Sequence, residues 1–216
     1  MNSSNANDNA SASALSTLLD RAAITQVVQD WGLARDTGRW AQLRSFHTPD
    51  GHVQTTWFVG SASEFVERSR QAAAAGAKVQ HFIGAATIEL SGERAVAETR
   101  MVLQVRAAVH GVPVDVTCYG LFHDLFLRDA EGWRIHQRVP VYEKDRLDTL
   151  VPGAVLQLDA ERLAALPEGC CHLTYVQSQG GAQITPNLPV PGSLALDRLY
   201  AQGRSWLSGS AFKLVE

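Results

Sequence analysis

The chain has 216 residues, of which 45% are hydrophobic, 19% charged and 7% aromatic, and its formal net charge is −3. This length is sufficient for one well-packed domain, and the ordinary composition excludes wholesale disorder and fibrous repeats. The slight negative charge lacks the basic excess that nucleic acids and anionic membranes attract, so we expect neither partner. Three cysteines without metal-ligand spacing indicate reduced thiols, no metal site and a cytoplasmic protein.

The N-terminal half predicts a tail followed by helices. Segment 1–13 is rich in Asn, Ser and Ala and has neither a basic start nor an apolar core, so we expect a disordered tail and no signal peptide. An apolar stripe at steps of three and four residues then predicts a long helix that ends near Gly38. Shorter helices are expected at Trp40–Phe46 and Glu64–Ala75, with a strand at His52–Phe58 between them.

From Val79 the hydrophobic period changes from 3.6 to 2, which indicates long antiparallel strands. Arg94–Arg106 alternates apolar and polar side chains, whereas Val114–Arg128 is apolar on both faces and is expected to be a central strand. A turn at Gly132 leads into a returning strand, Trp133–Tyr142. Helices followed by sequential hairpin strands predict an α+β fold, with the helices packed on one face of a curved sheet.

The last part of the chain, 151–216, differs in its sequence pattern from the main domain at 14–150. It contains a short helical pattern, a strand-like run at His172–Gln177, a Gly/Pro-rich stretch at 180–192 and a final amphipathic helix at Leu194–Leu207. This C-terminal extension has too few apolar residues to form a hydrophobic core by itself. We therefore expect it to wrap around the main domain, to cover the pocket opening of that domain as a lid, or to contact another subunit. No apolar window is long enough to predict a membrane span.

Several short motifs follow one another along the main domain: Asp20–Ile24, Asp36–Trp40, Phe46–Gly51, Gln80–Gly84, Ser91–Ala95 and Glu131–Ile135. Their order and spacing resemble the nuclear-transport-factor-2-like (NTF2-like) superfamily, in its SnoaL-like and scytalone dehydratase-like branch. The resemblance covers about residues 14–150. It implies a cone in which a strongly curved antiparallel sheet wraps around the N-terminal helices, with a deep apolar pocket suited to a small apolar molecule.

The resemblance also implies a catalytic Asp–His dyad. Asp36 and His81 occupy places that match the dyad of scytalone dehydratases and hexachlorocyclohexane dehydrochlorinases in this superfamily. A neutral imidazole can remove a proton near physiological pH, and a carboxylate that accepts its other N–H stabilises the imidazolium that forms. Each residue also has a structural interpretation, with Asp36 as a helix cap and His81 as a buried structural histidine.

An elimination also needs a donor for the departing group, and Arg138 and Tyr119 are the candidates. The pocket walls are expected to include four further residues: Trp40, Trp57, Phe122 and His123. Strand alternation does not decide whether either side chain faces the pocket. Arg138 lies opposite Trp133 and Ile135 in simple alternation, and both faces of the strand that carries Tyr119 are apolar.

The leading interpretation is a cofactor-independent, metal-free lyase or isomerase that acts on a small hydrophobic or aromatic substrate. Dehydration, dehydrohalogenation, a double-bond shift and retro-aldol C–C cleavage all begin with similar proton removal. Two other classes remain open, a non-catalytic β subunit of a ring-hydroxylating oxygenase and a small-ligand carrier. An apolar sheet face predicts a homo-oligomer, either a dimer or a trimer.

Overall fold

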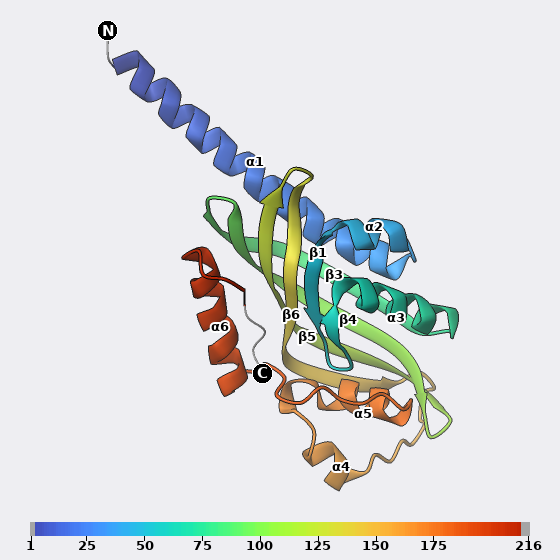
Figure 1. The fold of residues 1–216 in the computed structure, drawn as a ribbon. Coiled ribbons are helices and arrows are strands. Elements are labelled where there is room, and N and C mark those ends of the chain that lie inside the picture. The colour runs from blue at the N-terminus through green and yellow to red at the C-terminus, as the bar shows by residue number, and fades with distance from the viewer. Residues whose placement is uncertain (1–2, 213–216) are drawn as a thin grey trace.

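Over the residues that the structure describes, 3–212, N-terminal helices and a six-stranded sheet precede a helical extension (Figure 1). This structure is a computed structural model, and it describes side chains from residue 11 onward. The first helices are α1 (Ser3–Asp36), α2 (Trp40–Ser45) and α3 (Ala62–Ala74). The strands are β1 (His47–Gln54), β2 (Val59–Ser61), β3 (Lys78–Ser91), β4 (Arg94–Val109), β5 (Val112–Asp129) and β6 (Gly132–Thr149). The extension contains α4 (Ala160–Ala164), a 3-10 turn (Glu168–Cys170), α5 (Cys171–Gln179) and α6 (Leu194–Leu207). This order confirms the predicted α+β class.

The helix α1 confirms the predicted long N-terminal helix but begins earlier than expected. It starts at Ser3, so most of segment 1–13, for which we expected a disordered tail, is helical, and residues 1 and 2 lie outside the described part. The segment has no Gly or Pro and several Ala residues, so a helix nucleated by the packed part of α1 continues into it. The helix ends before Gly38, whose φ of +72° is a conformation that glycine adopts readily. Neither α1 nor any other described helix has an apolar stretch long enough to cross a membrane.

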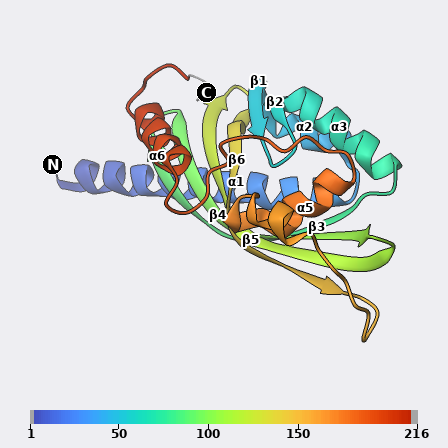
Figure 2. The same cartoon turned by 90° about the horizontal axis from the view of Figure 1, so that it is seen from below.

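The sheet bends around the helices and has the strand order β2-β1-β6-β5-β4-β3 (Figure 2). Neighbouring strands are antiparallel except β1 and β6, which run parallel, so the sheet is mixed where the sequence indicated antiparallel pairing throughout. These two strands are distant in the chain and no hairpin turn joins them, so the sequence pattern carried no signal for their direction. The sheet is not closed, and β2 and β3 form its two edges.

Side-chain alternation in β4 confirms the predicted faces of this strand. Ala95, Ala97 and Met101 are buried on the face toward the helices, whereas Glu98 and Arg100 point to the other side. The inner face joins buried residues of α1, such as Trp31, in one continuous hydrophobic core. The core therefore lies inside the curve of the sheet, where a pocket was expected.

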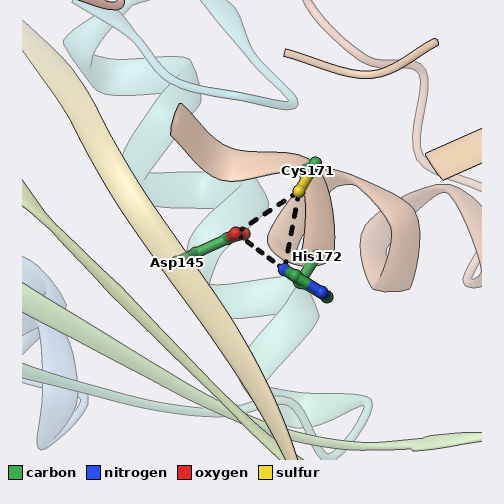
Figure 3. Close-up of side chains that lie close together, drawn as sticks. All are labelled: Asp145, Cys171 and His172. Carbon is green, nitrogen blue, oxygen red and sulfur yellow. Dashed lines mark hydrogen bonds and ion pairs between the residues drawn. The ribbon is translucent and has the colours of Figure 1, made fainter. Parts of the chain in front are cut away.

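The helix α5 inserts part of the C-terminal extension into this core, at the lower end of the sheet in Figure 1. Our expectation of a strand-like run at His172–Gln177 is wrong, because a short apolar run does not distinguish strand from helix. Leu173 and Tyr175 are buried among the core residues. Asp145 of β6 lies beside the start of α5 (Figure 3) and accepts the backbone N–H of Leu173 at 2.7 Å, which satisfies one free N–H group of the first turn.

The helix α6 covers the outer face of the sheet, the face directed away from α1. A second apolar cluster forms there between Leu121, Val139 and Leu199, and Trp206 Nε1 of α6 donates to the carbonyl oxygen of Phe126 at 3.1 Å. The sequence predicted that an apolar sheet face would pair with a second subunit. In the structure the chain's own α6 packs on part of it, and a homo-oligomer stays a prediction.

Candidate active site

Asp36 and His81 are in direct contact, although 45 residues separate them in the chain. Asp36 is the last residue of α1, and His81 lies early in β3. The Nδ1 atom of His81 lies 2.7 Å from Oδ1 of Asp36, and the backbone N–H of His81 donates to Oδ2 at 2.6 Å. Both carboxylate oxygens are therefore occupied by one residue, which fixes the imidazole ring relative to the helix end.

The geometry assigns one tautomer to His81. A carboxylate only accepts hydrogen bonds, so Nδ1 carries the proton and Nε2 of the neutral ring keeps its lone pair. Burial lowers the pKa of His81, and the hydrogen bond and charge of Asp36 oppose this effect in part. The imidazole is therefore neutral at physiological pH, which is the form that accepts a proton.

His81 lines a cavity of about 70 Å³ between the helices and the concave face of the sheet. Aromatic rings make up much of its wall: Trp31, Trp57, Phe65, Phe122 and Tyr142. The polar groups at the wall, besides His81, are Arg35, Thr55, Thr56, Arg138 and Gln177. None of the described residues that line this cavity is acidic. Two of the expected wall residues, Trp57 and Phe122, and two of the expected catalytic residues, His81 and Arg138, therefore lie at one cavity.

Arg138 faces the cavity because β6 contains a bulge. Simple alternation places Arg138 opposite Trp133 and Ile135. In the structure Ile135 and Gln137 lie opposite consecutive residues of β5, so His136 between them has no opposite residue. The extra residue reverses the alternation, and Ile135 and Arg138 both point inward.

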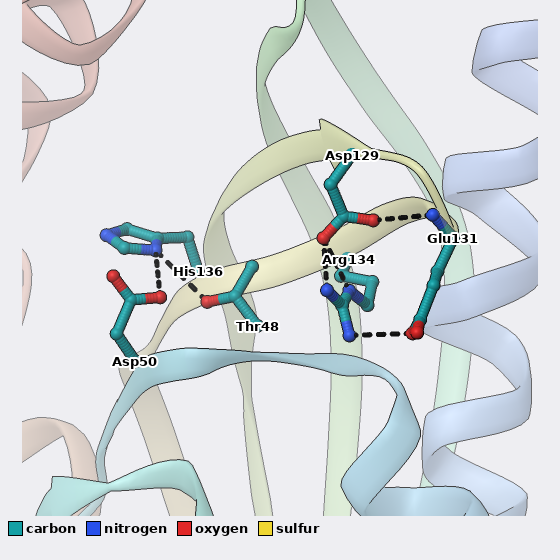
Figure 4. A network of polar contacts seen from close by, with 6 residues as sticks. All are labelled: Thr48, Asp50, Asp129, Glu131, Arg134 and His136. Carbon is teal, nitrogen blue, oxygen red and sulfur yellow. Dashed lines mark hydrogen bonds and ion pairs between the residues drawn. The ribbon is translucent and has the colours of Figure 1, made fainter.

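Polar contacts hold the bulge and the adjacent turn in place (Figure 4). His136 Nδ1 lies 3.1 Å from Oγ1 of Thr48 in β1 and 3.6 Å from a carboxylate oxygen of Asp50. Arg134 Nε donates to Asp129 at 2.9 Å across the turn between β5 and β6. These contacts hold the bulged residue and the part of β6 that precedes it.

Arg138 is a buried cation with a buried counterion. Its Nε and Nη2 donate to the two oxygens of Asp124 at 2.8 and 2.6 Å, and the side chains are only 1% and 0% exposed. The guanidinium carbon lies 4.1 Å from the ring centroids of both Trp31 and Phe122. The third nitrogen, Nη1, is buried and has no hydrogen-bond partner among the described residues. A strong donor is thus left available at the cavity wall.

Three of the residues predicted for the site lie elsewhere. Tyr119 is on the outer face of the sheet, where the amino group of Lys144 lies 5.3 Å from its ring centroid. His123 is also on the outer face, buried beneath α6, because β5 alternates regularly and Phe122 takes the inner position. Trp40 lies at the corner between α1 and α2 and is not part of the cavity wall. We therefore correct the predicted roles of these three side chains.

Some of the cavity residues were not predicted as site residues. Trp31 and Arg35 precede Asp36 on α1, and the sequence signalled Trp31 only as part of the helix stripe. Gln177 comes from α5 in the C-terminal extension and accepts a hydrogen bond from the hydroxyl of Thr56 at 2.6 Å. No local pattern indicates that a residue so late in the chain closes a cavity formed by the main domain.

A larger cavity, of about 310 Å³, lies outside the sheet and contains neither Asp36 nor His81. It is enclosed by β1, β6, α6 and the stretch from Thr185 to Pro189. Its described wall mixes aliphatic side chains with polar ones, among them His52, Gln137 and Arg198. The smaller cavity is the one lined by His81, which contacts Asp36, and by Arg138, so size does not identify the candidate site here.

Two further histidines are buried and neutral, and they make stability sensitive to acid. Burial lowers the pKa of His47 to about 3 and that of His123 to about 4. Well above pH 6.5, the ordinary pKa of histidine, both side chains are neutral in the folded and in the unfolded chain. Below pH 6.5 they bind protons in the unfolded chain but stay neutral in the folded chain. Between pH 6.5 and 5.5 each histidine is expected to lower the free energy of unfolding by about 1 kcal/mol. Urea titrations at the two pH values measure this loss, and His123→Gln should reduce it; an unchanged pH dependence in that variant would contradict the assignment.

Comparisons with known proteins place the chain in a family. The SnoaL-like domain profile matches residues 16–139, a range that contains Asp36, His81 and Arg138. "Uncharacterized protein AN9274" from Emericella nidulans is 29% identical over 209 residues, which covers 89% of this chain and 87% of that protein. Pea pathogenicity protein 2 from Fusarium vanettenii is 28% identical over 210 residues, or 92% of this chain and 90% of that protein. These two alignments cover 89% and 92% of this chain, so the likeness to the fungal proteins extends past residue 139, where the profile ends, into the C-terminal extension.

Solved structures agree on the fold. The crystal structure of the Kfla4162 protein from Kribbella flavida has a TM-score of 0.50 and 16% identity, and the likeness covers 62% of this chain and 93% of that protein. Two crystal structures from Novosphingobium aromaticivorans are also similar to this chain. An NTF2-like protein with a cystatin-like fold has a TM-score of 0.45 and 24% identity, and the likeness covers 60% of this chain and 85% of that protein. A structure described as "Putative Scytalone Dehydratase" has a TM-score of 0.49 and 16% identity, over 62% of this chain and 87% of that protein. At these identities the likeness shows the fold alone.

Proposed function

The chain belongs to the SnoaL-like domain family, and from this premise we propose that it is a cofactor-independent lyase or isomerase that uses His81 as its base. The fold is shared by dehydratases and by β subunits of ring hydroxylases, so it does not select a function. The observation that carries the proposal is the 2.7 Å contact of Asp36 with His81, which lines an aromatic cavity. A spacer subunit does not require an imidazole held in one tautomer at such a cavity.

In the proposed reaction Nε2 of His81 removes a proton from a substrate carbon beside a carbonyl or a leaving group. The C–H electron pair forms the new double bond, and the leaving group departs with its own electron pair or the carbonyl becomes an enolate. His81 becomes an imidazolium, whose charge the Asp36 carboxylate stabilises. Dehydration, dehydrohalogenation and a double-bond shift begin with this transfer from carbon, and retro-aldol cleavage begins with the same removal of a proton from a hydroxyl group.

Arg138 is proposed to stabilise the negative charge that develops on the substrate. Asp124 holds two of its nitrogens, and Nη1 is left without a partner among the described residues. A preorganised donor inside a poorly hydrated site acts strongly on charge that appears in the transition state. The leaving group or carbonyl oxygen is therefore expected to lie near Arg138, with the acidic C–H near His81.

The substrate is proposed to be a small hydrophobic or aromatic molecule with one electronegative end. Aromatic walls favour an apolar body, and Arg35 and Arg138 favour an oxygen or halogen. A volume of about 70 Å³ is small beside typical ligand pockets of roughly 300–1,000 Å³, so binding needs movement of a wall. Trp57, in the irregular segment between β1 and β2, is proposed to be the wall residue that moves.

The test is proton exchange and turnover in D2O. Wild type is incubated with a panel of enolisable compounds and compounds with a β-leaving group, and deuterium incorporation and products are followed by NMR. His81→Ala is expected to lower both rates by at least about 100-fold, because the base is removed. The matched control is His110→Asn, in the exposed turn between β4 and β5, where φ is +51° and Asn is well tolerated.

The same experiment separates the alternatives. Equal binding of a panel compound by wild type and His81→Ala, with no turnover by either, would support a ligand carrier and overturn the proposed reaction. Unaltered turnover in His81→Ala would show that another residue is the base. The cytoplasmic location and the dimer or trimer remain predictions that this experiment does not address.

A further inference from the structure

A compact group of three potential metal ligands lies outside the cavity, where α5 meets β6 (Figure 3). Asp145 comes from β6, and Cys171 and His172 are the first two residues of α5. The group offers one oxygen, one sulfur and one nitrogen, which is a combination that zinc accepts. The sequence shows no metal-ligand spacing here because Asp145 and Cys171 are 26 positions apart and only the fold brings them together.

The distances between these donor atoms suit a tetrahedral ion. Cys171 Sγ lies 3.6 Å from Asp145 Oδ1 and 3.5 Å from His172 Nδ1, and these last two atoms are 2.8 Å apart. Zinc bonds of about 2.3 Å to sulfur and about 2.0–2.2 Å to nitrogen or oxygen place ligand atoms of a tetrahedron roughly 3.4–3.6 Å apart. Two of the three separations already match, and the third needs to widen by about half an ångström.

From this arrangement we propose that Asp145, Cys171 and His172 bind one Zn²⁺ ion, with the fourth position open to solvent. The Asp145 side chain is 1% exposed, whereas that of His172 is 26% exposed, so the ion reaches the site from the His172 side. This site is separate from the His81 cavity and does not depend on the proposed lyase activity.

The environment of Asp145 orients it for this role. Its second oxygen, Oδ2, accepts the N–H of Leu173 at 2.7 Å, so Oδ1 is the atom directed at both Cys171 and His172. Outer hydrogen bonds of this kind fix the ligands of metal sites. The same bond offsets the partial positive charge at the start of α5, which would otherwise oppose a cation.

Charge balance also supports the site. A thiolate at Cys171 and the carboxylate of Asp145 together neutralise a divalent ion. A free thiol is mostly protonated at neutral pH. Zinc binding therefore forms the Zn–S bond and releases the thiol proton to solvent, while the proton by which Nδ1 of His172 donates to Asp145 moves to Nε2 of the same ring.

Occupation of the site would join the extension to the sheet. The helix α5 also carries Gln177 to the wall of the His81 cavity. A metal bridge between β6 and the first turn of α5 is expected to stabilise the folded chain, because the unfolded chain does not hold the three ligands together.

The test is isothermal titration of the chelator-treated full chain with ZnCl2. Wild type is expected to bind one ion per chain and to release about one proton, measured from the heat in buffers of different ionisation enthalpy. Cys171→Ser and Asp145→Asn are each expected to weaken binding at least tenfold. Cys170→Ala removes the adjacent buried thiol, which is not a ligand, and His110→Asn removes an exposed histidine, and both should bind as wild type does.

A spectroscopic measurement keeps the test independent of folding. Co²⁺ bound to the wild type is expected to show a sulfur-to-metal charge-transfer band that is absent in Cys171→Ser, while circular dichroism shows both proteins folded. Binding of Zn²⁺ by Cys171→Ser with the affinity of wild type, or no stoichiometric binding by wild type, would overturn the proposal.

Discussion

Replacing Asp124 with alanine is expected to lower the free energy of unfolding by about 3–5 kcal/mol. The substitution leaves the Arg138 guanidinium 1% exposed without its carboxylate, and a buried charge that loses its counterion is strongly destabilising. Urea unfolding followed by circular dichroism measures the change. A loss below about 1 kcal/mol would show that Arg138 finds another partner or reaches water.

The double variant Asp124→Leu with Arg138→Met provides the matched control for this prediction. Removing both charges leaves an apolar pair, which is expected to restore stability to within about 1–2 kcal/mol of wild type, since such replacements are often neutral. The double variant should nevertheless be inactive on a panel substrate, because it lacks the Nη1 donor of Arg138 at the cavity. A stable and active double variant would exclude Arg138 from the reaction.

The fold could be predicted from the sequence where local periodicity reports burial. The alternation in Arg94–Arg106 identified the inner face of β4 correctly, because one side of that strand packs on the core and the other does not. The parallel pairing of β1 with β6 and the helical state of His172–Gln177 were not predicted. Both are set by tertiary packing between segments that are distant in the chain, and no local pattern encodes them.

The candidate site was predictable to a smaller extent. Asp36 and His81 came from a resemblance, and the structure places them in contact. The direction of Arg138 depended on one extra residue in β6, which reverses the alternation from there to a second register shift after Tyr142 and is not visible in the hydrophobic pattern. Gln177 was not predicted because it reaches the cavity only after the extension has packed on the main domain.

Asp36→Asn is expected to lower the rate of proton removal by about 10²–10⁴-fold and to shift its dependence on pH. The amide no longer stabilises the imidazolium, and it can present an N–H to Nδ1, which favours the wrong tautomer of His81. In wild type the rate rises with pH as His81 loses its proton and is level above its pKa, which burial lowers. Without the carboxylate this pKa falls further, so the acid limb of kcat/KM should move to lower pH while the plateau falls.

The shift in pH profile distinguishes a dyad from a structural contact. If Asp36 only joined the end of α1 to β3, its replacement would reduce stability and rate but leave the acid limb where it is in wild type. Asp30→Asn is the matched control, because Asp30 lies on the same helix and accepts a hydrogen bond from Gln26 instead. An NMR titration of the imidazoles reports the same coupling without any substrate, through a resonance that is missing in His81→Ala. If that resonance titrates identically in wild type and Asp36→Asn, the two residues are not coupled, and the base must be sought elsewhere.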